Sequence, residues 1–249
     1  MSEKNDLISF KHIYDLSYRR NLQKFFVENH SEHVDCLRQW AEEIKNICFF
    51  SQDTNDINVL EVGCGIGRLT PFLAQIFGQT IGVDFSPYAI SQAQKLNVNS
   101  QGIFFINQDF LKFSYPSKFS LIFDSHCFHC IPWNEDRITF LKKSWENLKI
   151  GGFLAMETMV YNNALSEILD EDGLYWEKVL TSLDPIVENW LPTRRVKRAY
   201  EIENEILNMG FKIVYFKVQD QLKIVLPDGK SMVDLLRVIA CKKSNIKIN

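Results

Sequence analysis

Three closely spaced glycines are the first residues whose pattern points to chemistry. Gly63, Gly65 and Gly67 follow a short apolar segment and precede a helix-like one. Glycine lets the backbone turn tightly and lets a ligand approach without a Cβ in the way. The spacing G-x-G-x-G differs from the G-x-G-x-x-G that receives a dinucleotide pyrophosphate, and the Gly-Lys-Ser/Thr of a phosphate-binding loop is missing. Glu61, just before the glycines, would repel a phosphate, so the loop favours a cationic ligand.

Carboxylates follow the next two apolar segments. Asp84 ends the run Ile81-Gly82-Val83-Asp84, and Asp109 follows the run that ends at Asn107. Ligands of open α/β sheets bind at the carboxyl ends of strands, where an acid can accept both hydroxyls of a ribose. We therefore expect Asp84 to hold a ribose and Asp109 to accept from an adenine amino group.

These segments together resemble class I S-adenosylmethionine-dependent methyltransferases of the small-molecule type. The resemblance is carried by residues 59–67 (VLEVGCGIG), by residues 82–87 (GVDFSP) and by residues 148–154 (LKIGGFL), where Ile150 replaces the proline of the family's Leu-Lys-Pro-Gly-Gly. It implies S-adenosyl-L-methionine as cofactor and S-adenosyl-L-homocysteine as product. The cofactor-binding residues that the resemblance implies are Glu61, Gly63, Cys64, Gly65, Gly67, Arg68, Asp84, Phe85, Ser86, Gln108, Asp109, Phe110, Asp124 and Ser125. One departure is that the fourth strand opens Phe119-Ser120 rather than Phe-Asp, with the acid displaced to Asp124.

The segment Asp124-Ser125-His126-Cys127-Phe128-His129-Cys130 lies where this family places residues on the acceptor side. Methyl transfer from a sulfonium needs a base only if the acceptor must lose a proton. Imidazole titrates near neutral pH, so His126 is the preferred general base and His129 the second choice, with Asp124 beside them. Either histidine could instead only pack or hydrogen-bond near the cofactor.

Cys127 and Cys130 form a C-x-x-C pair. Structural zinc usually takes two spaced pairs of ligands, and the sequence has no second pair, so we expect no metal. Metalloid or thiol acceptors remain a minor alternative. The six cysteines are expected to be free thiols.

The elements that must position these residues alternate between strands and helices. Strands are predicted at 57–62, 79–84, 103–107 and 119–124, after Gly152 through Thr158, and at 211–226 and 232–241, the last two around a turn at 227–230. Alternation of this kind predicts a Rossmann-like, seven-stranded, mostly parallel sheet with an antiparallel C-terminal strand and helices on both faces. Ser86-Pro87 predicts a helix start, and Ile138, Leu141, Trp145 and Leu148 one face of a later helix.

Three regions are expected around this sheet. Residues 1–50 form an N-terminal helical lid, and residues 51–249 form the methyltransferase domain. Residues 160–198 form a mostly helical insertion that covers the substrate with Tyr161, Trp176 and Trp190, although these aromatics could equally be the core of the insertion. The basic cluster 194–198 (RRVKR) could bind an acidic substrate group, but a solvated helix start is the favoured interpretation.

The charge composition limits the classes of partner that the chain is expected to bind. The chain has 28 basic and 31 acidic residues, a net charge of −3, which gives no strong field toward nucleic acid or an anionic membrane. It shows no secretion signal and no apolar stretch of the roughly 18 residues that a membrane span needs, so we expect a cytoplasmic protein. A small-molecule acceptor is therefore preferred. The alternatives are a nucleic-acid or protein methyltransferase, or a non-catalytic nucleoside-binding module, and the oligomeric state is left open.

Overall fold

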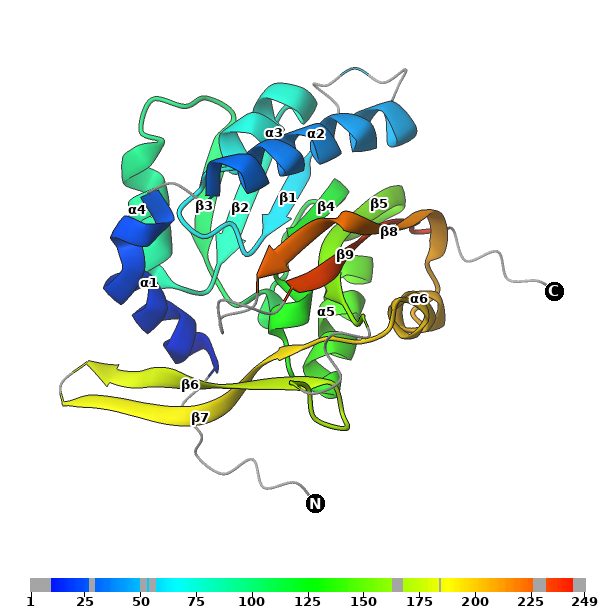
Figure 1. Cartoon of the computed structure of the whole chain (residues 1–249). Coiled ribbons are helices and arrows are strands. Elements are labelled where there is room, and N and C mark those ends of the chain that lie inside the picture. Colours follow the sequence, from blue (N-terminus) through cyan, green and yellow to red (C-terminus); the bar gives the residue numbers. More distant parts are fainter. Residues whose placement is uncertain are drawn as a thin grey trace.

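The computed structural model describes residues 10–26, 30–49, 53, 57–162, 168–183, 185–225 and 232–243. A seven-stranded sheet runs through the centre in the order β3-β2-β1-β4-β5-β9-β8 (Figure 1). The first five strands are parallel, and β9 is antiparallel to both of its neighbours. This confirms the predicted sheet. Its strands are β1 (Val59–Val62), β2 (Thr80–Asp84), β3 (Ile103–Asn107), β4 (Phe119–Ser125), β5 (Leu148–Val160), β8 (Lys212–Val225) and β9 (Met232–Cys241).

Helices cover both faces of the sheet. The helices are α1 (Phe10–Phe26), α2 (His30–Cys48), α3 (Thr70–Phe77), α4 (Pro87–Leu96), α5 (Asn134–Asn147) and α6 (Ala199–Asn208), with short 3₁₀ turns η2 (Phe110–Lys112) and η3 (Phe128–Cys130). Because side chains alternate along a strand, Val59 packs with α2 and α3 on one face, while Leu60 packs toward α5 and α6 on the other. No helix in the described ranges has the length and apolarity to cross a bilayer.

Helix α2 belongs to the core. Leu37, Trp40, Ala41 and Ile44 are buried at helical spacing and pack in one cluster with Leu73 of α3. Helix α1 lies between α4 and the strand β6, near the carboxyl ends of the parallel strands (Figure 1).

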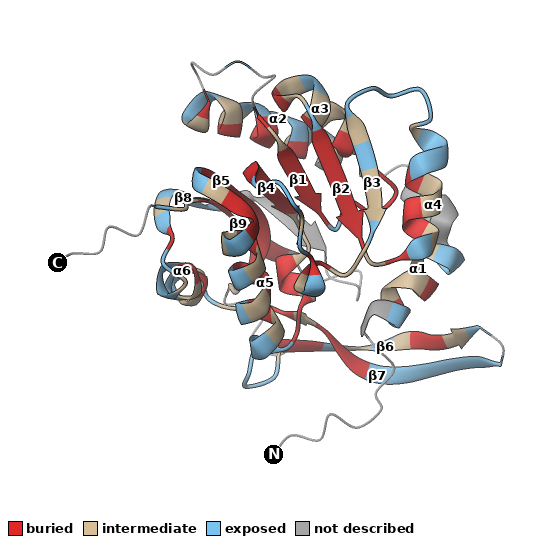
Figure 2. Ribbon diagram, turned by 180° about the vertical axis from the view of Figure 1, so that it is seen from behind, coloured by how far each residue is buried: buried red, intermediate tan, exposed pale blue. Residues whose placement is uncertain are grey.

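The prediction that the insertion at 160–198 is mostly helical is wrong. Its described part contains an antiparallel hairpin of β6 (Leu174–Leu183) and β7 (Ile186–Arg195), which extends away from the main sheet (Figure 2). Both segments are rich in the aromatic and β-branched residues that favour strands, and Leu183 pairs directly with Ile186 across a two-residue connection. The predicted turn at 227–230 lies outside the described residues.

The basic cluster is also placed differently from the favoured prediction. Arg194 and Arg195 end β7 and are largely buried, and α6 begins only at Ala199. Arg195 reaches back from the hairpin, with Nη1 donating to the Asp172 carbonyl oxygen at 3.0 Å. These arginines therefore belong to the hairpin rather than to a solvated helix start.

Candidate active site

The glycine loop joins β1 to α3 at the point where the strand order reverses. The backbone N–H groups of Gly63 and Cys64 both donate to the Val83 carbonyl oxygen, at 2.8 and 3.2 Å, which ties the loop to β2. All three glycines have positive φ, and a Cβ on Gly65 (φ 54°) would lie 2.7 Å from the Tyr18 hydroxyl. The loop conformation and the close approach of α1 therefore require glycine at this position.

Asp84 lies at the carboxyl end of β2, beside this loop. Its Oδ2 accepts from the Gly65 backbone N–H at 3.0 Å, and its Oδ1 accepts from the Ser86 backbone N–H at 2.8 Å. Burial raises the pKa of Asp84 to about 6 against the effect of these hydrogen bonds. Each carboxylate oxygen can accept a second hydrogen bond, so the side chain can bind a diol while it holds the loop.

Glu61 is buried on the face of β1 that meets α3. The Thr70 hydroxyl donates to its Oε2 at 2.5 Å. Burial raises the pKa of Glu61 to about 8, and the hydrogen bond from Thr70 offsets only part of that effect. A buried acid of this kind takes up a proton at neutral pH and gives it up when a cation comes near.

A cavity of about 160 Å³ opens next to the loop and is lined by Tyr18, Glu61, Gly63, Gly65, Arg68 and Ser125, among others. Five of these residues were predicted to bind the cofactor, and Tyr18 was not. A cavity lined by left-handed glycines and a buried acid, with the diol acceptor Asp84 bonded to one of those glycines, fits a ligand with a cationic end and a ribose.

The end of β3 adds the predicted adenine-side residues. The Gln108 backbone N–H donates to the Asp84 carbonyl oxygen at 3.0 Å, which places this segment beside β2. Asp109 caps η2 by accepting from the Leu111 backbone N–H at 3.0 Å. The Phe110 ring is buried in the core, 4.9 Å from the ring of Phe140, so only its backbone can serve a ligand.

Asp124 lies in a different environment from the one predicted. Its side chain is fully buried, and its two oxygens accept from the backbone N–H groups of Cys127 and Phe128 at 3.0 and 3.2 Å. Burial raises the pKa of Asp124 to about 7 despite these bonds. Asp124 therefore shapes the turn after β4, and any effect on catalysis acts through the residues of that turn.

His126 stands in this turn with a left-handed backbone, φ 67°, which is rare for a residue other than glycine. Its Nε2 lies 2.9 Å from Oε1 of Glu157, and Arg237 Nε donates to Oε2 of the same carboxylate at 2.6 Å. Burial opposes ionisation of Glu157, but His126 and Arg237 outweigh it and hold its pKa at about 2. Glu157 therefore fixes the proton on Nε2 and leaves Nδ1 as the ring atom that can take a proton.

His129 is buried behind His126, with the ring centroids 5.2 Å apart and edge to face. Its Nδ1 accepts from the Met159 backbone N–H at 3.3 Å, so the neutral ring carries its proton on Nε2. This tautomer makes Nε2 a hydrogen-bond donor. The geometry therefore favours His126 over His129 as a base.

Helix α1 supplies residues that the motif reasoning missed. Asp15 Oδ1 accepts from the Ser86 hydroxyl at 2.5 Å and from the Tyr88 backbone N–H at 3.3 Å, which fastens α1 to the start of α4. Tyr14 lies edge to face with Phe85 at 6.2 Å, one turn before Tyr18. The spacing of four between the two tyrosines was the available signal, since it puts both on one helix face.

The predicted substrate aromatics are not brought together at this cavity. Trp176 and Trp190 are 43% and 65% exposed, and strand alternation puts Trp176 on the hairpin face opposite Glu177. Tyr161 packs under the Arg198 guanidinium, 4.7 Å from its ring, at a separate surface cavity that also includes Asp170. Their role in acceptor binding stays a prediction.

Cys127 directly precedes η3, and Cys130 is its last residue. Burial raises the pKa of both thiols, which disfavours their ionised forms. Within the described ranges, no three His, Cys, Asp or Glu side chains are grouped as metal ligands would be.

The segment that holds the glycine loop is similar to known methyltransferases. A methyltransferase-domain family model matches residues 59–152. The chain is 30% identical over 116 residues to phosphoethanolamine N-methyltransferase 3 of Arabidopsis thaliana, covering 45% of this chain and 24% of that protein. It is 28% identical over 145 residues to malonyl-[acyl-carrier protein] O-methyltransferase of Priestia megaterium, covering 56% of this chain and 52% of that protein. The chain thus spans only a quarter to a half of these curated relatives.

The same fold is found in an S-adenosylmethionine-dependent methyltransferase from Clostridium acetobutylicum. The two structures align with a TM-score of 0.61 at 16% identity, over 93% of this chain and 99% of the other. At this identity, the likeness concerns the fold, and it extends well beyond the segment that the family model matches.

Proposed function

We propose that the chain is a class I S-adenosylmethionine-dependent methyltransferase that transfers the methyl group of that cofactor to a small-molecule acceptor, a proposal that the matching methyltransferase-domain model and the shared fold support. The observation that carries the proposal is the hydrogen bond from the backbone N–H of the left-handed Gly65 to the carboxylate of Asp84. Gly65 lines the same cavity as the buried Glu61. A simple strand–helix turn needs neither the buried acid nor the carboxylate that holds the loop.

The chain's own residues divide the work of holding the cofactor. Asp84 accepts from the ribose hydroxyls, the segment 108–110 faces the adenine, and the glycine loop leaves room for the methionine part. Glu61 stabilises positive charge near the loop. When bound, the cofactor supplies an electrophilic methyl group on a sulfonium.

The protein's part in the transfer is alignment, exclusion of water and, where the acceptor carries a proton, its removal. Holding two reactants in line can contribute roughly 7–11 kcal/mol. In the proposal, His126 takes the acceptor's proton at Nδ1, while Glu157 accepts from Nε2–H and stabilises the imidazolium. Arg237 keeps Glu157 ionised, and Asp124 holds the turn in which His126 lies.

Two findings support a small acceptor. The net charge of −3 gives no basic surface overall for nucleic acid. The Arabidopsis relative is named for a small molecule, phosphoethanolamine. A nucleic-acid or protein methyltransferase and a non-catalytic nucleoside-binding module are the competing functions, and the same experiment separates them.

The test is to incubate the protein with methyl-labelled S-adenosylmethionine and a metabolite extract, and in parallel with total RNA and with total protein. We expect label in a small product and none with Asp84→Ala at limiting cofactor. Label only in RNA or only in protein would show that the acceptor is that macromolecule and not a small molecule. Saturable cofactor binding by calorimetry with no labelled product in any arm would favour the binding module.

A further inference from the structure

The inner face of the β6–β7 hairpin carries a charged group that the cofactor does not explain. Arg194 ends β7, and its Nη1 donates to Oε1 of Glu177 at 2.8 Å and to the Thr193 hydroxyl oxygen at 3.0 Å. The Thr193 hydroxyl also donates to Glu177. One end of the guanidinium is thus fixed by the hairpin itself.

On the other edge of this guanidinium, Nε has no hydrogen-bond partner among the described residues. The Nε atom is buried, and the whole Arg194 side chain is only 17% exposed. Leaving a buried donor unsatisfied is costly, and more so for a charged group. The edge of a guanidinium that carries Nε matches two oxygens of a carboxylate or phosphate.

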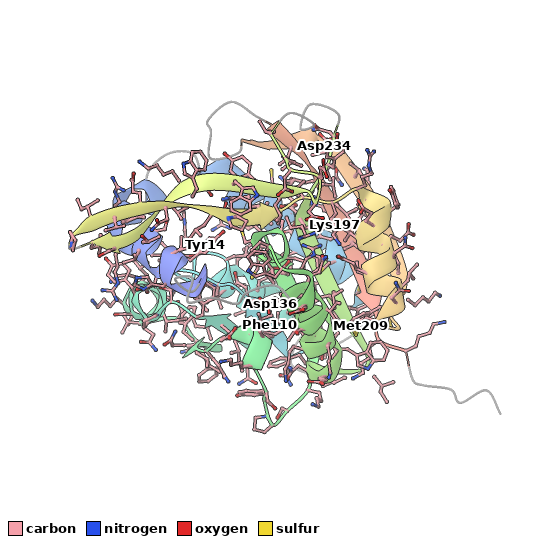
Figure 3. The ribbon with its side chains drawn as sticks, turned by 90° about the horizontal axis from the view of Figure 1, so that it is seen from below. Tyr14, Phe110, Asp136, Lys197, Met209 and Asp234 are labelled. Carbon is pink, nitrogen blue, oxygen red and sulfur yellow. The ribbon has the colours of Figure 1, made fainter. Side chains whose placement is uncertain are left out.

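A chain of contacts places Arg194 on the acceptor side of the cleft. Cys127 packs against the glycine loop, with its Cβ 3.2 Å from the position that a Cβ on Gly63 would take. Cys130, at the end of η3, shares a hydrogen bond with Tyr14, whose hydroxyl lies 3.4 Å from the Thr193 carbonyl oxygen. Figure 3 shows Tyr14 between α1 and the hairpin. Arg194 is therefore separated from the glycine loop by η3 and Tyr14.

We propose that Arg194 binds an anionic oxyacid group, a carboxylate or a phosphate, on the methyl acceptor. The inference rests on the proposed function for the identity of the acceptor, but the anion site itself does not. The anionic group is bound and not methylated, so the product keeps its negative charge. Glu177 stays on Nη1 and holds the guanidinium in place, while the anion takes the Nε edge.

The first test measures the anion site directly. The ¹⁵N–¹H signal of Arg194 Nε, assigned by its loss in Arg194→Lys, is followed during titration with inorganic phosphate or acetate at constant ionic strength. We expect a saturable shift in the wild type and in Lys178→Gln, whose exposed cation lies next to Glu177 on the opposite hairpin face. A signal that moves with neither anion overturns the proposal, and the overall spectrum reports whether each variant is folded.

The second test concerns the product. We expect the labelled product of the wild type to be retained by an anion exchanger, with loss of retention after phosphatase treatment for a phosphate and no loss for a carboxylate. Arg194→Gln should raise the KM for the acceptor about tenfold or more without changing cofactor affinity, because a hydrogen bond to a charged group is lost. A neutral or cationic labelled product overturns the inference and leaves methyl transfer intact. A shift of the Nε signal with no labelled product in any arm overturns the proposed function and leaves the anion site intact.

Discussion

On the proposed cofactor side of the cleft, the facing groups come from the ends of neighbouring parallel strands. Glu61 lies one residue before the end of β1, Asp84 ends β2 and Gln108 follows β3. Hydrogen bonds from the backbone N–H groups of Gly65 and Gln108 to Asp84 tie the three segments together. On the acceptor side, the groups come from α1, η3, β5 and the hairpin, and Tyr14 meets Thr193 across 179 positions of sequence.

The two sides consequently depend on different kinds of structure. Backbone conformation and strand order define the cofactor side, and residues 59–152, which the family model matches, include these strand ends together with His126 and η3 of the acceptor side. Side-chain contacts between distant segments define the acceptor side, with Arg194, Glu157 and Tyr14 all outside the matched segment. Cofactor use can thus be shared among relatives while acceptors differ.

The largest effect is expected on the acceptor side. His126→Asn keeps a residue that tolerates the left-handed backbone but removes the base, and we expect kcat to fall about 10²–10⁴-fold with unchanged cofactor affinity. The acceptor found by labelling serves for the assay, and exposed His12→Asn is the control. Unchanged kcat would remove the base from the acceptor side and leave alignment as its main contribution.

On the cofactor side, the largest loss is expected from a change in the backbone of the glycine loop. A Cβ on Gly67 (φ 72°) would lie 2.6 Å from the Phe105 ring, whereas one on Gly102 (φ 73°) would meet nothing within 4 Å. Both alanine variants carry left-handed strain of about 1–2 kcal/mol, and Gly67→Ala adds about 1–3 kcal/mol of overpacking. Denaturant unfolding should show the larger loss for Gly67→Ala. Equal losses would mean that packing does not constrain the loop.

Asp84→Asn should weaken cofactor binding by about 1.5–3 kcal/mol, which is the loss of hydrogen bonds to a charged acceptor. Calorimetry with S-adenosyl-L-homocysteine measures this, with exposed Asp35→Asn as the control. An affinity equal to that of the wild type would take Asp84 out of the site and leave it only its bonds to Gly65 and Ser86.

A further expected effect is a dependence of stability on pH. Glu61 has a pKa of about 8 in the folded protein against an ordinary value of 4.5, so the folded protein binds more protons than the unfolded chain between these values. The free energy of unfolding should therefore fall as pH rises from about 5 to 8. Asp84 and Asp124, with raised pKa values of about 6 and 7, add to the fall.

Glu61→Gln should flatten part of this slope, with the greatest gain in stability over the wild type near pH 8. Chemical denaturation at several pH values checks it. Glu157, with its pKa held at about 2, provides an internal control, because its contribution is lost only as pH falls below about 4.5 and should be the same in both proteins. Parallel curves above pH 5 would show that Glu61 is ionised in the folded protein.

The contrast between the two sides also explains what the sequence could predict. Strands β1 to β5, the Ser86 cap and the hairpin β8–β9 follow from local apolar runs and turn residues, and they were found. The helix face of α5 was misjudged: Ile138 is 57% exposed, while its neighbour Arg137 is buried because it binds Glu205 and the Phe128 carbonyl oxygen. A buried ion pair between distant segments leaves no local signal, and the same holds for the contact of Tyr14 with Thr193.

Arg237 shows how far the folding unit extends. Its Nε holds Glu157, and its Nη2 donates at 3.2 Å to the Cys36 carbonyl oxygen in α2, so one guanidinium joins the last strand, the fifth strand and an early helix. A fragment cut to residues 59–152 would lack Arg237, Glu157 and Cys36, and it would expose the apolar side chains that pack against Trp40. Similarity to other proteins thus marks out the segment that relatives share, whereas the packed core also takes in helix α2 before that segment and strand β9 after it.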